Sequence, residues 1–402
     1  MNKTNLVFDF SNMAMRALFT CSYANAGAVT TFDTDEECGI LIRKIAMDMA
    51  YVARIFTPDR VIVACDARDP WRRSLYEDIE GESYKGNRQK DNTKNWTKIF
   101  TELNNYKEIL KSQNFVVTEL PNAEADDLAA LWKQESFNNG DNVILVSSDK
   151  DWAQLVEYAG KNFCICFNPI SNNKGKKKLY ATQECLDWIT NTDKKMDIFF
   201  TNYNSYKDTL STIKTKDPKI DYEVINPHMI LLDKIMCGDD GDNAPTIYEY
   251  YKNGKKVRMT PSRCKKILES LNIETITDLC DAASAGALLP ALSSSFKKEI
   301  DDIDINERVM RQRKLVELNP NLFPNNIVTT FSYHVKDSTD IGYIDTTDIN
   351  LETILKKSKY VDENYKSAGP KESGIFDNIK NLEKYIPELS AAGSVNMSNT
   401  LF

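Results

Sequence analysis

Histidine is scarce in this chain of 402 residues, which contains His228 and His334 and no others. Catalytic triads and most general acid–base sites use a histidine side chain, so the chain has little material for either kind of chemistry. The GxxxxGK[ST] run of a P-loop is also missing, which disfavours a P-loop nucleotidase. Carboxylates are therefore the side chains that we expect to carry any reaction.

Long apolar runs and paired cysteines are missing as well. No stretch approaches the roughly 20 apolar residues that span a bilayer, and the N-terminal run from Leu6 to Phe10 is broken by Asp9. The nine cysteines are scattered, odd in number and without a CxxC pair, which argues against a disulfide framework and against a zinc knuckle. We therefore expect a cytoplasmic protein with reduced core thiols and no membrane segment.

The composition is that of a folded protein with an uneven charge distribution. Hydrophobic residues make up 42% of the chain and charged residues 27%, and at roughly 150 residues per domain the length favours two to three domains. The net charge of −8 by itself disfavours a polyanionic partner. Basic residues nevertheless cluster in 72–98, 174–178 and 252–266. This distribution predicts an acidic pocket flanked by basic arms.

The first 170 residues alternate short apolar runs with helical patterns. Continuous apolar runs are typical of buried parallel strands, and the alternation with helices predicts an α/β fold with a central, mostly parallel sheet flanked by helices. Helical patterns dominate again after residue 226. The expected strands are 5–9, 60–66, 114–120, 142–149 and 163–167, and the expected helices are 39–56, 96–111, 125–134 and 152–158.

Acidic residues follow the predicted strands. Asp9 and Asp66 end the first two, an acidic group follows the third, and Asp149 and Asp151 follow the fourth. Ligands in open α/β sheets bind outside the carboxyl ends of the strands, so these acids should converge on one crevice. The loop GDDGDN adds Asp239 and Asp242. The nine candidate metal ligands are Asp9, Asp66, Glu124, Asp126, Asp127, Asp149, Asp151, Asp239 and Asp242.

So many carboxylates predict bound cations. Like charges a few ångströms apart would force some of the acids to take up protons, whereas Mg²⁺ prefers hard oxygen ligands and usually takes one or two carboxylates per ion. We therefore expect two Mg²⁺ ions, replaceable by Mn²⁺, and metal-assisted phosphodiester hydrolysis. The alternative for any single acid, such as Asp149 before the run WAQLV, is a helix cap. Capping is compatible with metal binding.

Five acidic motifs in order resemble one known family. FDFS at 8–11, ACDA at 64–67, EADD at 124–127, SSDKDW at 147–152 and GDDGDN at 238–243 are similar to the flap endonuclease and 5′-nuclease superfamily. Within it, the runs CDARDPWRR, SYKGNR and RMTPSR most resemble the ribonuclease H group of T-even bacteriophages, which are 5′ to 3′ exonucleases and flap endonucleases. The resemblance covers about 1–170 and 226–275. It implies a PIN-like nuclease fold and removal of RNA primers or 5′ flaps in phage DNA replication.

The resemblance also implies roles for the acids. Asp9, Asp66, Glu124 and Asp126 would hold a first metal ion. Asp149, Asp151 and Asp242 would hold a second, with Asp127 and Asp239 bridging or in the outer shell.

A basic and aromatic segment, about 68–98, should bind nucleic acid. Interleaved aromatic and basic side chains are typical of single-strand channels. In the family this segment is an arch over the active site, so the resemblance implies that Tyr84 stacks on a base while Lys85 and Arg88 neutralise charge on the phosphate. The alternative is a solvated basic helix. Further candidate contacts with nucleic acid are Arg72, Arg73, Lys255, Lys256, Arg258, Ser262, Arg263, Lys265 and Lys266.

Four regions follow from these patterns: a nuclease domain with its arch (1–170), an inserted segment (171–226), a helix-three-turn-helix and helical C-terminal domain (227–390) and a flexible tail (391–402). The GIG-like turn of many relatives is missing, so a monovalent cation at the duplex-binding loop is not expected. The tail ends in Leu401 and Phe402, which predicts docking on a sliding clamp. A frayed terminus is the alternative.

The expected partners are branched or nicked duplex DNA with a 5′ single strand, RNA–DNA hybrid, a sliding clamp and a single-stranded DNA-binding protein. The chain should act as a monomer, in the host cytoplasm if a phage encodes it. Two other functions stay open. A PIN-like ribonuclease shares the acidic sheet but usually lacks the arch and the later duplex-binding helices. A non-catalytic, clamp-tethered scaffold that binds nucleic acid would keep the fold and lose acids.

Overall fold

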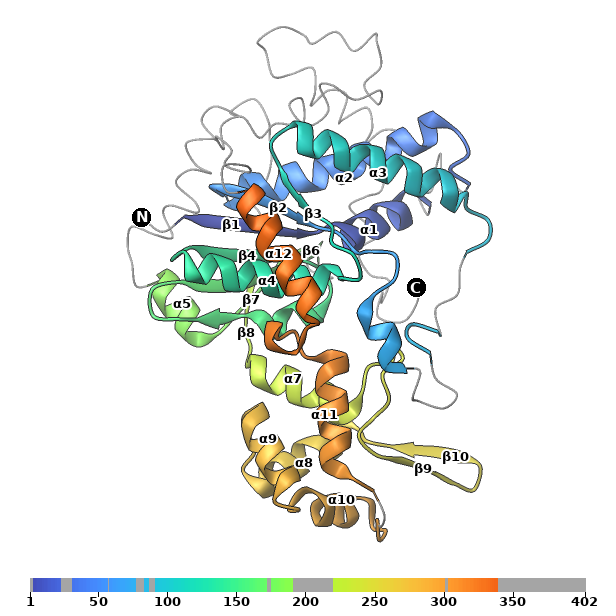
Figure 1. Ribbon diagram of the computed structural model, residues 1–402, viewed down its shortest axis with the longest axis vertical. Coiled ribbons are helices and arrows are strands. Elements are labelled where there is room, and N and C mark those ends of the chain that lie inside the picture. Colours follow the sequence, from blue (N-terminus) through green and yellow to red (C-terminus); the bar gives the residue numbers. More distant parts are fainter. Residues whose placement is uncertain are drawn as a thin grey trace, which may run out of the picture. The chain divides into compact units, whose positions relative to one another are not determined.

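A computed structural model describes residues 3–22, 31–56, 58–76, 83–86, 91–171, 175–190, 220–300 and 303–338 (Figure 1). These residues form two compact units. The first comprises the described parts of 3–67, 91–225 and 329–338, and the second those of 68–86 and 226–328. Arg88, residues 191–219 of the expected insertion, and residues 339–402 with the expected clamp-binding tail lie outside the described residues.

The first unit is built on a mostly parallel sheet, as the apolar runs predict. Its order is β3-β2-β1-β4-β6-β7-β8, and β5 pairs with β6. The neighbours from β3 to β6 are parallel, whereas β7 and β5 run antiparallel to β6. The strands are β1 (Thr4–Asp9), β2 (Arg60–Ala64), β3 (Val116–Thr118), β4 (Asn142–Val146), β5 (Glu157–Tyr158), β6 (Phe163–Ser171), β7 (Lys177–Ala181) and β8 (Ile220–Val224).

Helices cover both faces of this sheet (Figure 1). On β1, Leu6 and Phe8 belong to the core formed with α1, α2 and α3. Because side chains alternate along a strand, Val7 points to the opposite face, where α4 packs against β1, β2 and β4. The helices of this unit are α1 (Phe10–Ser22), α2 (Asp35–Phe56), α3 (Trp96–Ser112), α4 (Ala125–Asn138), α5 (Gln183–Thr190) and most of α12 (Asn325–Asp337).

The end of α12 is anchored on the first unit by polar and aromatic contacts. His334 Nε2 lies 3.0 Å from Thr118 Oγ1, and the rings of Phe331 and Trp132 are 5.1 Å apart in an edge-on arrangement. Arg60 donates a hydrogen bond of 2.7 Å to the Ser338 carbonyl. His334 therefore packs against the edge strand β3, and burial lowers the pKa of its imidazole.

Two sequence expectations for this unit differ from the structure. The stretch 152–158 is not one helix: a 3₁₀ helix, η2 (Lys150–Leu155), ends where Val156 becomes extended, and β5 follows because its residues pair with β6. The residues placed in an insertion at 171–226 include β7 and β8, which continue the sheet. In β8 (IDYEV) apolar residues alternate with acidic ones, the pattern of a strand at a sheet edge with one face toward solvent.

The second unit is mainly helical. Its core is formed by buried apolar side chains of α7 to α11, such as Leu232, Ile267 and Val309, together with Tyr76 and Tyr84. Its elements are η1 (Trp71–Tyr76), α7 (Pro227–Cys237), β9 (Glu249–Lys252), β10 (Lys255–Arg258), α8 (Pro261–Leu271), α9 (Ile276–Ser284), α10 (Leu288–Phe296), α11 (Ile305–Val316) and η3 (Pro320–Leu322).

A β-hairpin lies between α7 and α8 and carries the start of the basic cluster 252–266. Strands β9 and β10 pair antiparallel around Asn253 and Gly254, which both adopt positive φ, as two-residue hairpin turns require. The Asn-Gly dipeptide between two short runs is the sequence signal for this turn. The hairpin carries exposed lysines away from the helical core of the second unit.

Within the described residues, none of the helices combines the length and the apolar character that crossing a bilayer requires.

Candidate active site

The acidic residues of the first unit gather where the strand order reverses. Strand β1 lies between β2 and β4. From β1 the sheet is first extended on one side, by β2 and β3, and then on the other side, by β4 and β6. Asp9 is the last residue of β1, Asp66 follows β2, and Asp149 follows β4. The carboxyl ends of parallel strands lie along one edge of a sheet, so this reversal forms the crevice in which α/β proteins bind ligands.

Asp9, at the end of β1, is buried, with 5% of its surface exposed. Its carboxylate accepts hydrogen bonds from the Asn12 backbone N–H (3.0 Å) and the Ser147 hydroxyl (2.7 Å). Burial raises the pKa of Asp9 to about 7, and Asp66 and Asp149 add to the rise. The three carboxylates are therefore close enough to repel one another.

Asp126 extends the same group from the first turn of α4. Its Oδ1 accepts a hydrogen bond of 2.5 Å from the Trp152 indole N–H, which ties α4 to η2. Burial raises the pKa of Asp126 well above its ordinary value, and the neighbouring acids Asp149, Asp9, Glu124 and Asp151 raise it further. The structure thus brings together six of the predicted ligands: Asp9, Asp66, Glu124, Asp126, Asp149 and Asp151.

Several of these acids also cap helices. Glu124 is the N-cap residue of α4, and its backbone N–H donates 3.0 Å to Asp127 Oδ2. Asp66 accepts from the Ala125 N–H at 2.7 Å, and Asp149 accepts from the Asp151 N–H at 3.0 Å. Asp127 is fully buried in this capping box, whereas Asp66 and Asp149 keep exposed surface. The capping bonds therefore leave part of the Asp66 and Asp149 carboxylates accessible, whereas Asp127 supports the helix start.

Three uncharged residues beside the acids, Asn12, Ser147 and Ser148, form hydrogen bonds at the site and were not singled out from the sequence. Ser147 holds Asp9, and its oxygen also accepts from the Asp149 N–H at 3.0 Å. Asn12 Oδ1 accepts from the backbone N–H (3.1 Å) and the hydroxyl (2.7 Å) of Ser148. Their position inside the motifs FDFSN and SSDKD, next to Asp9 and Asp149 in the sequence, could have identified them.

The donor set of the first unit suits hard divalent cations. Every candidate ligand there is a carboxylate oxygen, the donor type that Mg²⁺ and Mn²⁺ prefer. Burial raises the pKa values of Asp9 and Asp126, and repulsion from the neighbouring carboxylates raises them further. A divalent cation would remove this repulsion, so the residues present fit such ions.

In the second unit, residues 83–86 contact the GDDGDN loop. The Lys85 N–H donates 3.1 Å to the Asp242 carbonyl, and Asn243 Nδ2 donates 3.0 Å to the Ser83 carbonyl. Lys85 Nζ lies 3.6 Å from Asp242 Oδ1. Lys85 has a φ of 55°, a left-handed conformation that is unfavourable for a residue with a side chain. The loop contacts hold it there.

Asp239 is paired within the same loop. Its carboxylate forms an ion pair with Lys234 and accepts from the Gly241 N–H at 2.7 Å. Burial acts to raise the pKa of Asp239, but the Lys234 ammonium and these hydrogen bonds outweigh it and lower the pKa. The structure therefore gives Asp239 a role in shaping the loop.

The aromatic and basic residues of the predicted arch fall into two groups. Tyr84 is 7% exposed and packs on Tyr76 with ring centroids 5.3 Å apart. Arg72 is 2% exposed, with its guanidinium carbon 4.8 Å from the Trp71 ring centroid and 5.9 Å from that of Phe323. Arg73 is exposed and pairs with Asp69. Tyr84 and Arg72 thus contribute to the core of the second unit, and Arg73 faces solvent.

The remaining predicted contacts with nucleic acid lie on the hairpin and α8. Lys255, Lys256, Ser262, Lys265 and Lys266 are exposed. Three of the basic residues carry acidic partners: Lys256 pairs with Glu249, Arg258 with Asp240 and Lys265 with Glu269.

The first turn of α8 is capped by the residue before the helix. Its N-cap is Thr260, whose hydroxyl accepts from the Arg263 N–H, while Ser262 follows inside the helix. Arg263 stacks on Phe296 at 4.7 Å and donates 2.9 Å to the Arg258 carbonyl. Arg263 therefore packs the hairpin and α10 against α8.

Comparisons with known proteins point to one family. Residues 3–186 match the family described as 5′-3′ exonuclease, N-terminal resolvase-like domain. A solved structure of bacteriophage T5 5′-exonuclease with bound zinc is 16% identical to this chain, covers 85% of it and 100% of itself, and has a TM-score of 0.51. The bacteriophage T5 D15 protein crystallised with metal ions is 18% identical, covers 86% of this chain and 99% of itself, and has a TM-score of 0.48. No curated protein sequence matches the chain.

The family match covers the strands and helices that carry the six clustered acids of the first unit. The T5 exonuclease structure shares the fold, a mostly parallel sheet flanked by helices. The acidic motifs, their convergence at the carboxyl edge of the sheet and the family match agree, and residues 3–186 carry a 5′-3′ exonuclease N-terminal resolvase-like domain.

Proposed function

We propose that this protein is a structure-selective 5′-nuclease that hydrolyses phosphodiester bonds with two divalent cations, Mg²⁺ or Mn²⁺. The observation that carries the proposal is the convergence of six acids at the carboxyl edge of the sheet, where burial and then mutual repulsion raise the pKa values of Asp9 and Asp126. An acidic cluster of this kind is costly unless cations neutralise it, so it indicates a site built for them.

The acids of the first unit are proposed to bind two ions. We assign Asp9, Asp66, Glu124 and Asp126 to a first ion, and Asp149 and Asp151 to a second. A pair of bound divalent ions supplies an activated water and stabilises the leaving oxygen in phosphodiester cleavage. Ser147, Asn12 and Trp152 keep the carboxylates oriented through the hydrogen bonds described above.

The assignments in the second unit rest on the family resemblance of the motif GDDGDN. We propose Asp242 as a further ligand of the second ion and Asp239 as an outer-shell residue. Lys85, with Arg88 beside it in the sequence, is proposed to neutralise the phosphate as charge develops. Lys85 Nζ lies 3.6 Å from Asp242 Oδ1, a longer and more readily exchanged pairing than a direct hydrogen bond.

The substrate proposed is duplex DNA with a 5′ single strand, or RNA–DNA hybrid, as in primer and flap removal during phage DNA replication. The family name implies 5′ to 3′ polarity. The lysines of the hairpin and α8 are proposed to contact phosphates of the duplex, which positions the substrate without reading its sequence. Docking on a sliding clamp through 391–402 and co-operation with a single-stranded DNA-binding protein remain proposals.

A cleavage assay tests this function. The protein is incubated with 5′-labelled flap, nicked, hybrid and single-stranded RNA substrates of matched sequence, with Mg²⁺, Mn²⁺, Ca²⁺ or chelator. We expect short products from the flap or hybrid with Mg²⁺ and with Mn²⁺ and none with chelator. Cleavage of single-stranded RNA without preference for a junction would instead identify a PIN-like ribonuclease. Binding of the flap without cleavage in any metal would identify a non-catalytic scaffold.

A further inference from the structure

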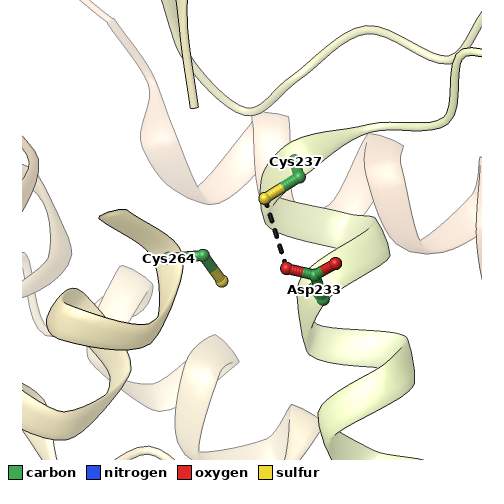
Figure 2. A group of neighbouring side chains, drawn as sticks. All are labelled: Asp233, Cys237 and Cys264. Carbon is green, nitrogen blue, oxygen red and sulfur yellow. Dashed lines mark hydrogen bonds between the residues drawn. The ribbon is translucent and has the colours of Figure 1, made fainter. Parts of the chain in front are cut away.

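Two cysteines and one aspartate of the second unit meet between α7 and α8 (Figure 2). Asp233 and Cys237 lie four residues apart on α7, so both point from the same face of the helix. Cys264 comes from the first turns of α8. One ligand atom from each of the three residues lies within 4.8 Å of the other two. This group is separate from the carboxylates described above.

The spacing of the donor atoms is close to that of a tetrahedral metal site. Cys237 Sγ and Asp233 Oδ1 are 3.4 Å apart. With Zn–S of about 2.3 Å and Zn–O of about 2.0 Å, two such ligands of one tetrahedral zinc ion lie roughly 3.5 Å apart. The remaining separations, at most 4.8 Å, close with small side-chain rotations. The three donors can therefore share one ion without movement of the helices.

The backbone around these donors is firmly placed. Gly238, directly after Cys237, has a φ of 76°, and a Cβ atom there would lie 2.4 Å from the Ala244 carbonyl oxygen. On the other side, the Cys264 N–H donates 2.9 Å to the carbonyl of Thr260, the N-cap of α8. The buried thiols thus sit on rigid elements, and rigid placement of ligands favours binding of a metal ion.

The chemistry of the donors selects a soft cation. Two thiolates and one carboxylate suit Zn²⁺, whereas Mg²⁺ prefers oxygen ligands and octahedral geometry. Helix ends add to the preference: the carbonyl end of α7 at Cys237 favours a cation, and the first turns of α8 favour the Cys264 thiolate. The half-buried Asp233 leaves a side from which water can reach the fourth position.

We propose that Asp233, Cys237 and Cys264 bind one zinc ion that clamps α7 to α8, with water as the fourth ligand. The two thiols release their protons to solvent as the ion binds. The clamp holds the two helices that flank the GDDGDN loop and the hairpin, so the ion has a structural role that does not depend on the nuclease activity.

Cobalt provides a direct test, because thiolate-bound Co²⁺ shows an intense sulfur-to-metal charge-transfer band and carboxylate-bound Co²⁺ does not. The full chain is purified with a thiol-free reductant, stripped with chelator and titrated with Co²⁺ and then Zn²⁺. We expect a band that saturates at one Co²⁺ per chain and disappears as Zn²⁺ displaces cobalt. Cys237→Ser and Cys264→Ser should abolish the band.

Asp233→Asn should weaken zinc binding roughly tenfold or more, since even supporting residues around metal ligands are worth about 10–100-fold. Two controls should keep the wild-type band. Cys280→Ser removes a thiol of α9 outside the group. The double variant Asp149→Asn/Asp151→Asn disables the carboxylate site instead, which separates this proposal from the proposed function.

Absence of the band in folded wild-type protein would overturn the proposal, and circular dichroism reports whether each sample is folded. A Cys237–Cys264 disulfide that forms in place of metal binding, detected by mass spectrometry without reduction, would overturn it as well. Retention of the band in both Cys237→Ser and Cys264→Ser would place the bound ion elsewhere and have the same consequence.

Discussion

Lys85 Nζ lies 3.6 Å from Asp242 Oδ1, and the backbone N–H of Lys85 also donates 3.1 Å to the carbonyl of the same aspartate. A proposed phosphate-neutralising residue is thus held by a proposed metal-site residue. Bound cations and a substrate phosphate would compete for both partners. The pair therefore links the proposed neutralisation of the phosphate by Lys85 to the proposed binding of a metal ion by Asp242.

Lys85→Ala is expected to slow cleavage by about 100-fold or more, the usual loss when one charged contact to a reacting phosphate is removed. Single-turnover rates on the 5′-labelled flap measure the effect. Lys111→Ala is the matched control, because Lys111 is an exposed lysine of α3 outside the predicted arch and should leave the rate unchanged. Equal rates for Lys85→Ala and wild type would remove Lys85 from the chemistry.

Asp149→Asn together with Asp151→Asn should abolish cleavage in Mg²⁺ and leave DNA binding within a few fold. Both acids lie close enough to Asp126 to raise its pKa, so they belong to the proposed metal site. Their replacement removes two proposed ligands and leaves the basic hairpin unaltered. Product sizing and a fluorescence-anisotropy titration in Ca²⁺ measure the two quantities. Full activity of the double variant would contradict the ligand assignment.

Stability in chelator should depend on pH through Asp9. Burial raises its pKa to about 7 in the folded state, above the ordinary value of 3.8, so the folded protein binds a proton that the unfolded chain releases. The resulting stabilisation is present below about pH 4 and is lost as the pH rises to about 7. Asp9→Asn should therefore raise the free energy of unfolding at pH 8 in chelator, on the order of a few kcal/mol.

Chemical denaturation from pH 4 to pH 8 measures this dependence, with Asp9→Asn beside wild type. Mg²⁺ should restore wild-type stability at pH 8 and have less effect on the variant, because the ion neutralises the same carboxylate. A slope that is identical in wild type and Asp9→Asn would show that other groups set the pH dependence.

Lys255→Ala with Lys256→Ala should weaken binding to duplex DNA evenly across sequences. If both lysines neutralise phosphates, the slope of log K against log salt should fall by about 2, since each phosphate contact contributes about 0.9. Anisotropy titrations at several salt concentrations with two unrelated sequences measure it. Lys111→Ala, an exposed lysine of α3, serves as the control. An unchanged slope would exclude the hairpin from the interface.

Gly238→Ala should destabilise the protein by roughly 2 to 4 kcal/mol, because it combines a left-handed backbone with steric overlap. A Cβ at this position would lie 2.4 Å from the Ala244 carbonyl oxygen and 2.6 Å from that of Pro245. Gly254→Ala is the matched control: its φ is +72° but nothing lies within 4 Å, so about 1 kcal/mol is expected. Similar losses for both variants would contradict the steric argument.

Much of the first unit was predictable because its signals are local. Apolar runs such as 60–64 and 142–146 report burial on both faces of a strand, and an acid directly after a strand lies at the carboxyl edge whatever the rest of the chain does. The same reasoning failed at 152–158, where pairing of Glu157 and Tyr158 with β6 overrides a helical pattern. A strand partner that comes later in the chain is invisible to local periodicity.

The amino-acid sequence by itself determined the fold class, the identity of the acids and their place at strand ends, because side-chain chemistry and periodicity are properties of short segments. The tertiary structure alone decided that Arg72 is buried under aromatic rings, that Lys85 faces Asp242, and that Cys237 meets Cys264. Each of these relations joins segments distant in the chain, and packing of the whole unit, rather than any local pattern, sets which side chains meet.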